Sequence, residues 1–265
     1  MSFLDQILAT KQIEIAEAKA RTPLSELEQL AAQRNDYRGF KASLSKPGVR
    51  VIAEIKRASP SRGDISPNLD PSTVASAYEQ GGAAAISVLT EPAFFKGSAA
   101  DLQQARAAVT LPVLRKEFIL EPYQVFETAA MGADAILLIV RILDDQQLHD
   151  LHDLARSLGL NVLTEIFDET DATRLAGMND LLIGINNRDL THFHTDTARA
   201  ARIAATLPKD AAVVAASGIM ETEDLQRILA QGIRRFLIGE ALVRQNDPVT
   251  TLREWTTLPV DPLIL

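Results

Sequence analysis

The chain has 265 residues, a net charge of −8 and 46% apolar residues, which is enough to bury a large core. Its acidic balance argues against general nucleic-acid binding, so we expect no nucleic-acid partner. The absence of cysteine excludes disulfides, thiolate metal sites and a cysteine nucleophile, and it is typical of a reducing cytoplasm. The chain has neither a charge-free apolar run of roughly 18 residues nor a signal-peptide core. We therefore expect a cytoplasmic protein without membrane contact.

The first 50 residues precede the first predicted strand and are expected to form an N-terminal helical extension. Apolar residues at helical spacing predict a helix over Ser2–Arg21, with Ser2 as its N-cap. A second helix is predicted over Thr22–Gln33, with Pro23 in its first turn. If a barrel follows, this extension could cover its bottom or lie over its mouth, and the periodicity leaves both placements open.

Short apolar runs recur along the rest of the chain. They are nearly continuous rather than alternating, as expected of parallel strands buried on both faces. Eight are predicted as strands: Val51–Lys56, Ala83–Thr90, Leu111–Phe118, Ala133–Val140, Asn161–Ile166, Leu181–Asn187, Ala211–Ser217 and Arg234–Gly239. Helical segments with a glycine near their ends fill gaps between them: Pro71–Gln80, Asp144–Leu158 and Glu221–Ala230.

Eight strand–helix units predict an α/β fold, a (β/α)8 TIM barrel with an N-terminal helical extension. We expect a single domain over residues 1–265, with residues 1–50 as the extension. A doubly wound open sheet is the alternative. It usually needs fewer strands, and the first turn of this chain lacks a GxGxxG pattern.

Charged and polar residues stand at the ends of several predicted strands, where this fold places its active site. Because side chains alternate along a strand, Glu54 and Lys56 share one face, as do Lys116 and Phe118. Later strands end with Glu165 and with Asn186, which precedes Arg188. Each charge alone could be a satisfied ion pair or a rim charge, but a cluster of them favours acid–base chemistry on an anionic substrate. We expect burial beside another ammonium to lower the pKa of the catalytic lysine.

Glycine and serine residues near three strand ends suggest a phosphate subsite. Ser217, Gly218 and Gly239 follow the last two strands, where this fold often binds phosphate through backbone amides, and Ser59 could add a hydroxyl. Plain turns are the other interpretation. His192 and His194 could suggest a metal, but a surface loop is favoured, and we expect no metal site.

Six segments together resemble the indole-3-glycerol phosphate synthase family. They are Glu-Ile-Lys-Arg-Ala-Ser-Pro-Ser (54–61), Ile-Ser-Val-Leu-Thr-Glu (86–91), Phe-Phe-Lys-Gly-Ser (94–98), Leu-Pro-Val-Leu-Arg-Lys-Glu-Phe (111–118), Gly-Ala-Asp-Ala-Ile-Leu-Leu-Ile (132–139) and Ile-Gly-Ile-Asn-Asn-Arg-Asp-Leu (183–190). The similarity extends from the N-terminal helix to about Arg244. As a set these motifs are highly specific.

The resemblance implies a cytoplasmic lyase of tryptophan biosynthesis that uses no cofactor. It would convert 1-(2-carboxyphenylamino)-1-deoxyribulose 5-phosphate into indole-3-glycerol phosphate, with loss of CO2 and water. Lys116 would be the general acid, Glu165 its acid/base partner, and Lys56 would pair with the substrate carboxylate. Glu54 and Asn186 would orient polar groups, and Arg188 would support the site. The resemblance further implies aromatic-ring contacts from Phe95, Phe118, Leu137 and Leu190, and phosphate contacts from Ser59, Ser217, Gly218 and Gly239.

One residue departs from the family pattern. The family usually has Glu-Ser-Gly-Ile after the seventh strand, and this chain has Ala216 in place of the glutamate. Activity could be reduced, or another carboxylate such as Glu54 could compensate. Two alternatives therefore stay open: a weakly active or non-catalytic barrel that binds phosphorylated ligands, and, with less support, a phosphoribosylanthranilate isomerase. For this chain we expect a small phosphorylated substrate as the partner, and a monomer or weak homodimer as the oligomeric state.

Overall fold

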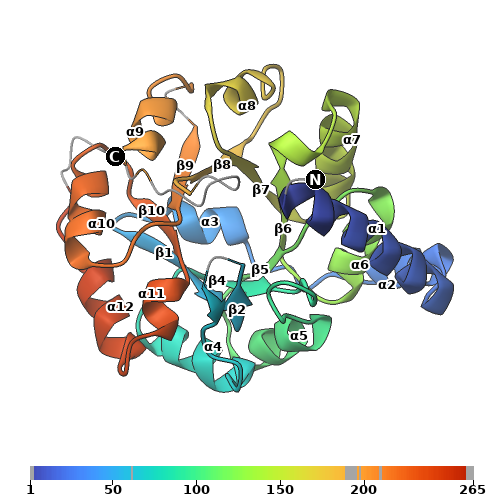
Figure 1. Ribbon diagram of the computed structural model, residues 1–265, viewed down its shortest axis with the longest axis horizontal. Helices are drawn as coiled ribbons and strands as arrows, with labels where there is room; N and C mark the ends of the chain where they lie inside the picture. The colour runs from blue at the N-terminus through green and yellow to red at the C-terminus, as the bar shows by residue number, and fades with distance from the viewer. Residues whose placement is uncertain (1–2, 61, 189–195, 197, 209–210, 261–265) are drawn as a thin grey trace.

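The computed structural model describes residues 3–60, 62–188, 196, 198–208 and 211–260. Within these residues, eight parallel strands close into a barrel in the order β1-β10-β9-β8-β7-β6-β5-β4 (Figure 1). The strands are β1 (Arg50–Ile55), β4 (Ala85–Leu89), β5 (Val113–Lys116), β6 (Ala135–Ile139), β7 (Asn161–Ile166), β8 (Leu182–Asn186), β9 (Ala212–Ala216) and β10 (Arg235–Ile238). Each lies within or one residue from its predicted run, so the predicted TIM barrel is confirmed.

The barrel has a filled interior, as the apolar runs require. Ile52, Leu114, Leu163 and Leu237 belong to one buried cluster, which also contains residues of the N-terminal segment. Alternate residues of the same strands, such as Val51, pack against the surrounding helices in a second, larger cluster. Both faces of each strand are therefore buried, which explains why the strand sequences do not alternate with polar residues.

Helices and short strands occupy the connections between barrel strands. They are β2 (Ala58–Ser59), β3 (Gly63–Asp64), α4 (Pro71–Gln80), α5 (Ala99–Ala108), α6 (Pro122–Ala130), the 3-10 helix η1 (Val140–Ile142), α7 (Asp145–Ser157), α8 (Glu169–Thr173), α9 (Arg199–Ala204), α10 (Thr222–Leu229), α11 (Glu240–Val243) and α12 (Pro248–Thr256). Capping fixes several of their starts: the Asp144 carboxylate accepts from the Gln147 amide at 2.8 Å at the start of α7. The three predicted connecting helices correspond to α4, α7 and α10 and are confirmed.

The N-terminal extension reaches both ends of the barrel, so both placements left open by the sequence occur. It contains α1 (Phe3–Arg21), α2 (Leu24–Ala32) and α3 (Phe40–Ser45). Helix α3 closes the bottom, where Phe40 and Leu44 are fully buried in the interior cluster. Helix α1 begins at the mouth, where Phe3 and Ile7 line a pocket. The predicted N-cap, Ser2, lies outside the described residues.

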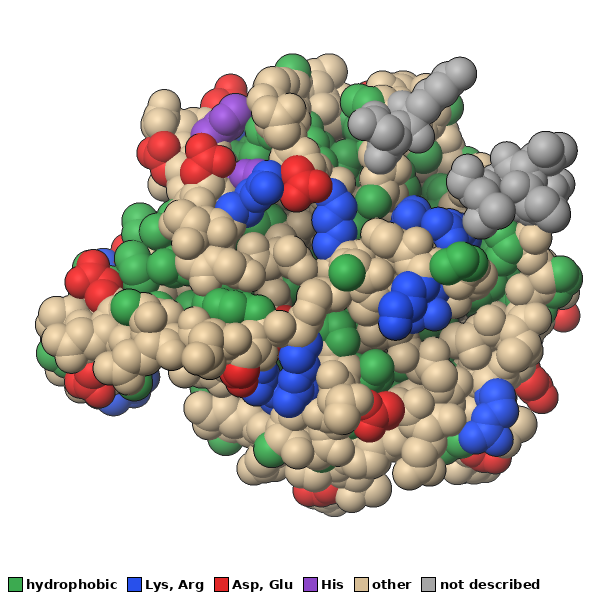
Figure 2. Space-filling model, turned by 180° about the vertical axis from the view of Figure 1, so that it is seen from behind, with side chains coloured by type: hydrophobic (Ala, Val, Ile, Leu, Met, Phe, Trp, Pro, Cys, Tyr) green, Lys and Arg blue, Asp and Glu red, His purple; other side chains and the backbone are tan. Residues whose placement is uncertain are grey.

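Charged side chains are spread over the surface. Figure 2 shows both signs mixed with hydrophobic side chains on the face turned away from the viewer of Figure 1. Among the described residues, no helix combines the length and the apolar character needed to cross a membrane.

Candidate active site

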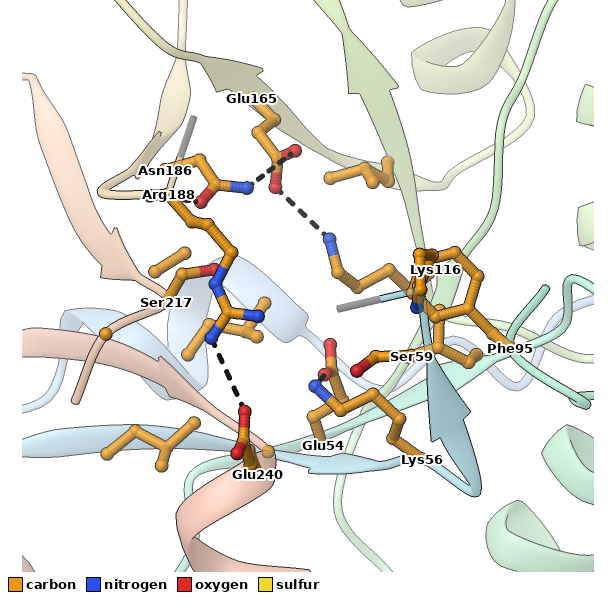
Figure 3. A pocket seen from close by; sticks show the side chains of 18 of the residues that line it. Glu54, Lys56, Ser59, Phe95, Lys116, Glu165, Asn186, Arg188, Ser217 and Glu240 are labelled. Carbon is orange, nitrogen blue, oxygen red and sulfur yellow. Dashed lines mark hydrogen bonds and ion pairs between the residues drawn. The ribbon is translucent and has the colours of Figure 1, made fainter. Parts of the chain in front are cut away.

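A pocket with about 1080 Å³ of free space, part of it open to solvent, lies at the carboxyl ends of the barrel strands. Thirteen of the fourteen predicted site residues line it: Glu54, Lys56, Ser59, Phe95, Lys116, Phe118, Leu137, Glu165, Asn186, Arg188, Ser217, Gly218 and Gly239 (Figure 3). The other one, Leu190, lies outside the described residues, as do His192 and His194. The fold thus brings together side chains that are far apart in the sequence.

Lys116 and Glu165 face each other across the pocket. The Lys116 ammonium lies 3.1 Å from Glu165 Oε2, and the Asn186 amide donates to Glu165 Oε1 at 3.3 Å. The Asn186 oxygen in turn accepts from the Arg188 backbone amide at 3.0 Å. Strands β5, β7 and β8 each contribute one of the three interacting side chains, because their alternation points these residues inward.

The pKa of Lys116 is raised, which corrects the expectation of a lowered value. Burial disfavours the ammonium, but the carboxylates of Glu165 and Glu54 outweigh it and raise the pKa above the ordinary value of 10.5. The other ammonium, Lys56, is itself paired with Glu54 Oε1 at 3.0 Å. Carboxylates therefore dominate the surroundings of Lys116, which carries its proton at neutral pH.

Glu54, near the end of β1, lines the pocket. It is almost fully buried, and its Oε2 has no hydrogen-bond partner among the described residues. A Cβ at Gly239, which follows β10, would lie 2.5 Å from Glu54 Oε1, so any larger residue there would force this carboxylate to move. An uncompensated buried oxygen is costly unless a ligand group can meet it.

The pocket lining includes features expected of an anion subsite, at Ser59, Ser217 and Gly218. The Ser59 hydroxyl is buried without a hydrogen-bond partner among the described residues. Ser217 and Gly218 have φ angles of 67° and 75°, and a positive φ is uncommon for serine. The Ser217 carbonyl accepts from the Asn187 side chain at 3.2 Å, which helps to hold this turn.

The carboxylate that faces Arg188 comes from the start of α11, which follows β10, rather than from β9. Ala216 lines the pocket, and Arg188 lies 3.4 Å from Glu240 Oε2. Arg62 lies 3.2 Å from the other oxygen of Glu240, which connects the loop after β1 to the start of α11. Glu54 is engaged with Lys56, and whether it compensates for Ala216 stays a prediction.

Apolar side chains form one wall of the pocket. The rings of Phe95 and Phe118 are 6.2 Å apart, and Leu137 lies on the same lining. Phe3 and Ile7 of α1 complete this wall, and sequence reasoning did not assign them to the site. Their helical spacing showed a buried face but gave no sign of what that face covers.

The comparisons with known proteins agree with this geometry. A family model described as indole-3-glycerol phosphate synthase matches residues 4–255. The chain belongs to the indole-3-glycerol phosphate synthase family. It is 53% identical over 259 residues to the indole-3-glycerol phosphate synthase of Desulfosudis oleivorans, covering 96% of this chain and 98% of that protein. The corresponding protein of Rhodopirellula baltica is 45% identical over 248 residues, covering 93% of this chain and 96% of that protein.

The activity of this family member is that of an indole-3-glycerol phosphate synthase, a carboxy-lyase of tryptophan biosynthesis. Solved structures support the barrel fold at low sequence identity. N-acetylmannosamine-6-phosphate 2-epimerase from Clostridium perfringens superposes with a TM-score of 0.59 at 15% identity, covering 79% of this chain and 92% of that one. Thiamine phosphate pyrophosphorylase from Pyrococcus furiosus gives a TM-score of 0.55 at 15% identity, covering 78% of this chain and 93% of that one.

Proposed function

We propose that the pocket at the barrel mouth carries the synthase reaction, with Lys116 as general acid and Glu165 as its partner in proton transfer. The observation that carries this proposal is the 3.1 Å ion pair between these two side chains inside a pocket with an apolar wall. A protonated lysine supplies an acid, and the adjacent carboxylate can accept a proton later in the same turnover.

The reaction needs two proton donations and one proton abstraction. Lys116 protonates the carbonyl oxygen of 1-(2-carboxyphenylamino)-1-deoxyribulose 5-phosphate while the ring carbon that bears the carboxylate bonds to the carbonyl carbon. Breaking the bond to the carboxylate releases CO2 and restores electrons to the ring. The new hydroxyl then leaves as water with a proton from an acid, and Glu165 removes a proton from the substrate to complete the indole.

The remaining side chains of the pocket hold the substrate. Lys56 is proposed to pair with the substrate carboxylate, with its partner Glu54 and with Asn186 orienting polar groups. Arg188 supports this arrangement from the loop after β8. The aromatic ring of the substrate would lie against Phe95, Phe118 and Leu137, with Leu190 as a further predicted contact. Support comes from their common lining of one pocket.

The phosphate is proposed to bind at the end of the pocket near Ser59, Ser217, Gly218 and Gly239. The Ser59 hydroxyl, buried and without a partner among the described residues, offers a donor there. The positive φ angles of Ser217 and Gly218 turn the backbone in a way that suits close approach by an anion.

A weakly active or non-catalytic barrel is the second candidate, and Ala216 is the observation that favours it. Purified protein should be given the carboxyphenylamino ribulose phosphate while indole fluorescence is followed. Product formation supports the proposed roles, whereas tight binding without product would favour the second candidate. Turnover of phosphoribosylanthranilate alone would indicate the isomerase.

Family membership also supports the cytoplasm as the place where the enzyme acts. We propose a monomer or weak homodimer, because the pocket is built from residues of one chain. Sedimentation at micromolar concentration tests this. A stable higher oligomer would contradict it.

A further inference from the structure

Lys11 occupies an unusual position in helix α1. It lies between Ile7 and Ile15 in the buried stripe of the helix and is only 4% exposed. Lysine is almost never buried to this extent unless its ammonium is paired. Phe3 and Ile7, on the same helix, line the pocket, whereas Lys11 does not. The residue therefore sits beside the active site without reaching the substrate.

The partner of Lys11 belongs to the strand end that carries the proposed acid. The Lys11 ammonium lies 2.9 Å from Glu117 Oε1, and Glu117 is also buried. Glu14, one turn along the helix, is a second partner. Burial disfavours the ammonium, yet these two carboxylates outweigh it and raise the pKa of Lys11. Lys11 is thus charged at neutral pH and joins α1 to the residue that follows Lys116.

Glu117 holds several groups at the end of β5. Its carboxylate accepts from the Thr90 hydroxyl at 2.7 Å and from the Phe118 backbone amide at 2.9 Å. Thr90 follows β4, so this one carboxylate joins the ends of two neighbouring strands. Phe118 packs against Phe95 in the apolar wall. A shift of Glu117 would therefore disturb both the wall and the adjacent Lys116.

The charge of Lys11 also acts on a second buried carboxylate. Glu91 is fully buried and accepts from the backbone amides of Phe94 and Phe95 at 2.7 and 2.9 Å. Burial raises the pKa of this carboxyl, and the charge of Lys11 acts in the opposite direction. Phe94 meets Phe3 of α1 edge to face, with ring centroids 5.2 Å apart. Glu91 and the contact with Phe3 thus hold the loop that carries Phe94 and Phe95 against α1.

We propose that Lys11 is a positioning residue for the synthase reaction. By holding α1 over the mouth of the barrel, it keeps Lys116 and the aromatic wall in place. The inference rests on the proposed roles of Lys116 and of that wall. Removing the ammonium leaves buried Glu117 with only the more distant Arg115, 3.9 Å away, as a cation. The helix then loses its attachment or the carboxylate moves toward solvent. In either case Phe3, Phe95 and Phe118 lose their relative positions.

The test compares two lysines of the same helix. Lys19 lies two turns further along, is 49% exposed and pairs with Glu121 at 2.5 Å, so Lys19→Met is the matched control. We expect Lys11→Met to raise KM about tenfold and lower kcat by a smaller factor, because the wall binds the ring before and during the reaction. Lys11→Arg, which keeps the charge, should stay within about threefold of the wild type, and Lys19→Met within about twofold.

Hydrogen exchange should show faster exchange in α1 for Lys11→Met and wild-type exchange for Lys19→Met. If Lys11→Met does not fold, the double variant Lys11→Met/Glu117→Gln removes both buried charges, and its KM should still be raised. A wild-type KM in folded Lys11→Met or in the folded double variant, whatever its Tm, would overturn the proposal. Failure of the Lys116 assignment is recognised separately, as retained turnover in Lys116→Ala.

Discussion

Buried charged side chains find different partners at the two ends of the barrel. At the bottom, α3 inserts Phe40 into the interior, and the Arg50 and Arg235 side chains donate to backbone carbonyls of Ser43 and Leu44, both at 3.0 Å. At the mouth, ammonium groups meet side-chain carboxylates, as in the pair of Lys116 with Glu165. The buried carboxylate at the bottom, Asp134, pairs with Arg34 at 2.9 Å, and a guanidinium keeps its proton, whereas an ammonium and a carboxylate can exchange one. The bottom therefore serves the fold, and the mouth can serve proton transfer.

Removing the proposed acid tests whether the side chains at the barrel mouth serve catalysis. We expect Lys116→Ala to lower kcat by about 10²–10⁴, because general acid catalysis contributes on this scale. Binding of inorganic phosphate, measured by calorimetry, should remain close to wild type. Lys41→Ala is the control, since Lys41 lies on α3 at the other end and pairs with Asp180. A kcat in Lys116→Ala equal to that of the control would refute the acid assignment.

A cavity made at the bottom of the barrel tests whether that end serves the stability of the fold. We expect Phe40→Ala to lower the free energy of unfolding by about 3–5 kcal/mol, because Phe40 is fully buried in the barrel interior. The Tm should fall by roughly 10 °C. Measured below the new Tm, kcat should stay within about threefold of the wild type. A large loss of kcat in the folded variant would show that the bottom of the barrel also affects catalysis at the mouth.

The pH dependence tests the electrostatic coupling at the mouth. Because Glu165 raises the pKa of Lys116 above 10.5, loss of the Lys116 proton should not limit the wild type between pH 7 and that value. Glu165→Gln removes the main charge that favours the ammonium while burial remains, so the alkaline limb of the kcat profile should move to lower pH. Glu127→Gln, which affects a carboxylate paired with Arg115, is the control. An unmoved limb in Glu165→Gln would contradict the coupling.

The smallest effects are expected where Ala216 and Glu240 lie. Glu240→Gln removes the carboxylate that holds Arg188 and Arg62, and KM should rise about three- to tenfold, since both pairs are partly exposed to solvent. Ala216→Glu alone should change kcat less than about threefold, and in the Glu240→Gln background it should recover part of the loss. No recovery would mean that a carboxylate on β9 cannot take the place of Glu240.

The sequence predicted the barrel well because its strands are nearly continuous apolar runs, and runs such as Asn161–Ile166 coincide with the observed strand. The charged residues and the glycine–serine turns could be listed because this fold gathers strand ends at one mouth. Phe95, Leu137 and Leu190 were implied only by the resemblance to the family. Glu54 and Lys56 needed only the two-residue period of a strand to be placed on one face.

The interactions between strands could not be predicted in the same way. Lys116 and Glu165 are 49 residues apart in the sequence, so the sign of the pKa shift of Lys116 depended on a contact that spacing does not show. Lys11 was missed because a lysine within an amphipathic helix is normally assigned to the solvent face. Its position four residues from both Ile7 and Ile15 was the available signal.

The most direct test replaces the central ion pair by apolar side chains of similar length. In Lys116→Met/Glu165→Leu, the desolvation cost of two buried charges disappears, so a barrel mouth that holds these charges for catalysis should become no less stable. The account predicts a Tm equal to or above that of the wild type, together with loss of indole formation from the carboxyphenylamino ribulose phosphate. A clearly lowered Tm with indole formation retained would show that the pair serves the fold, and would contradict the account.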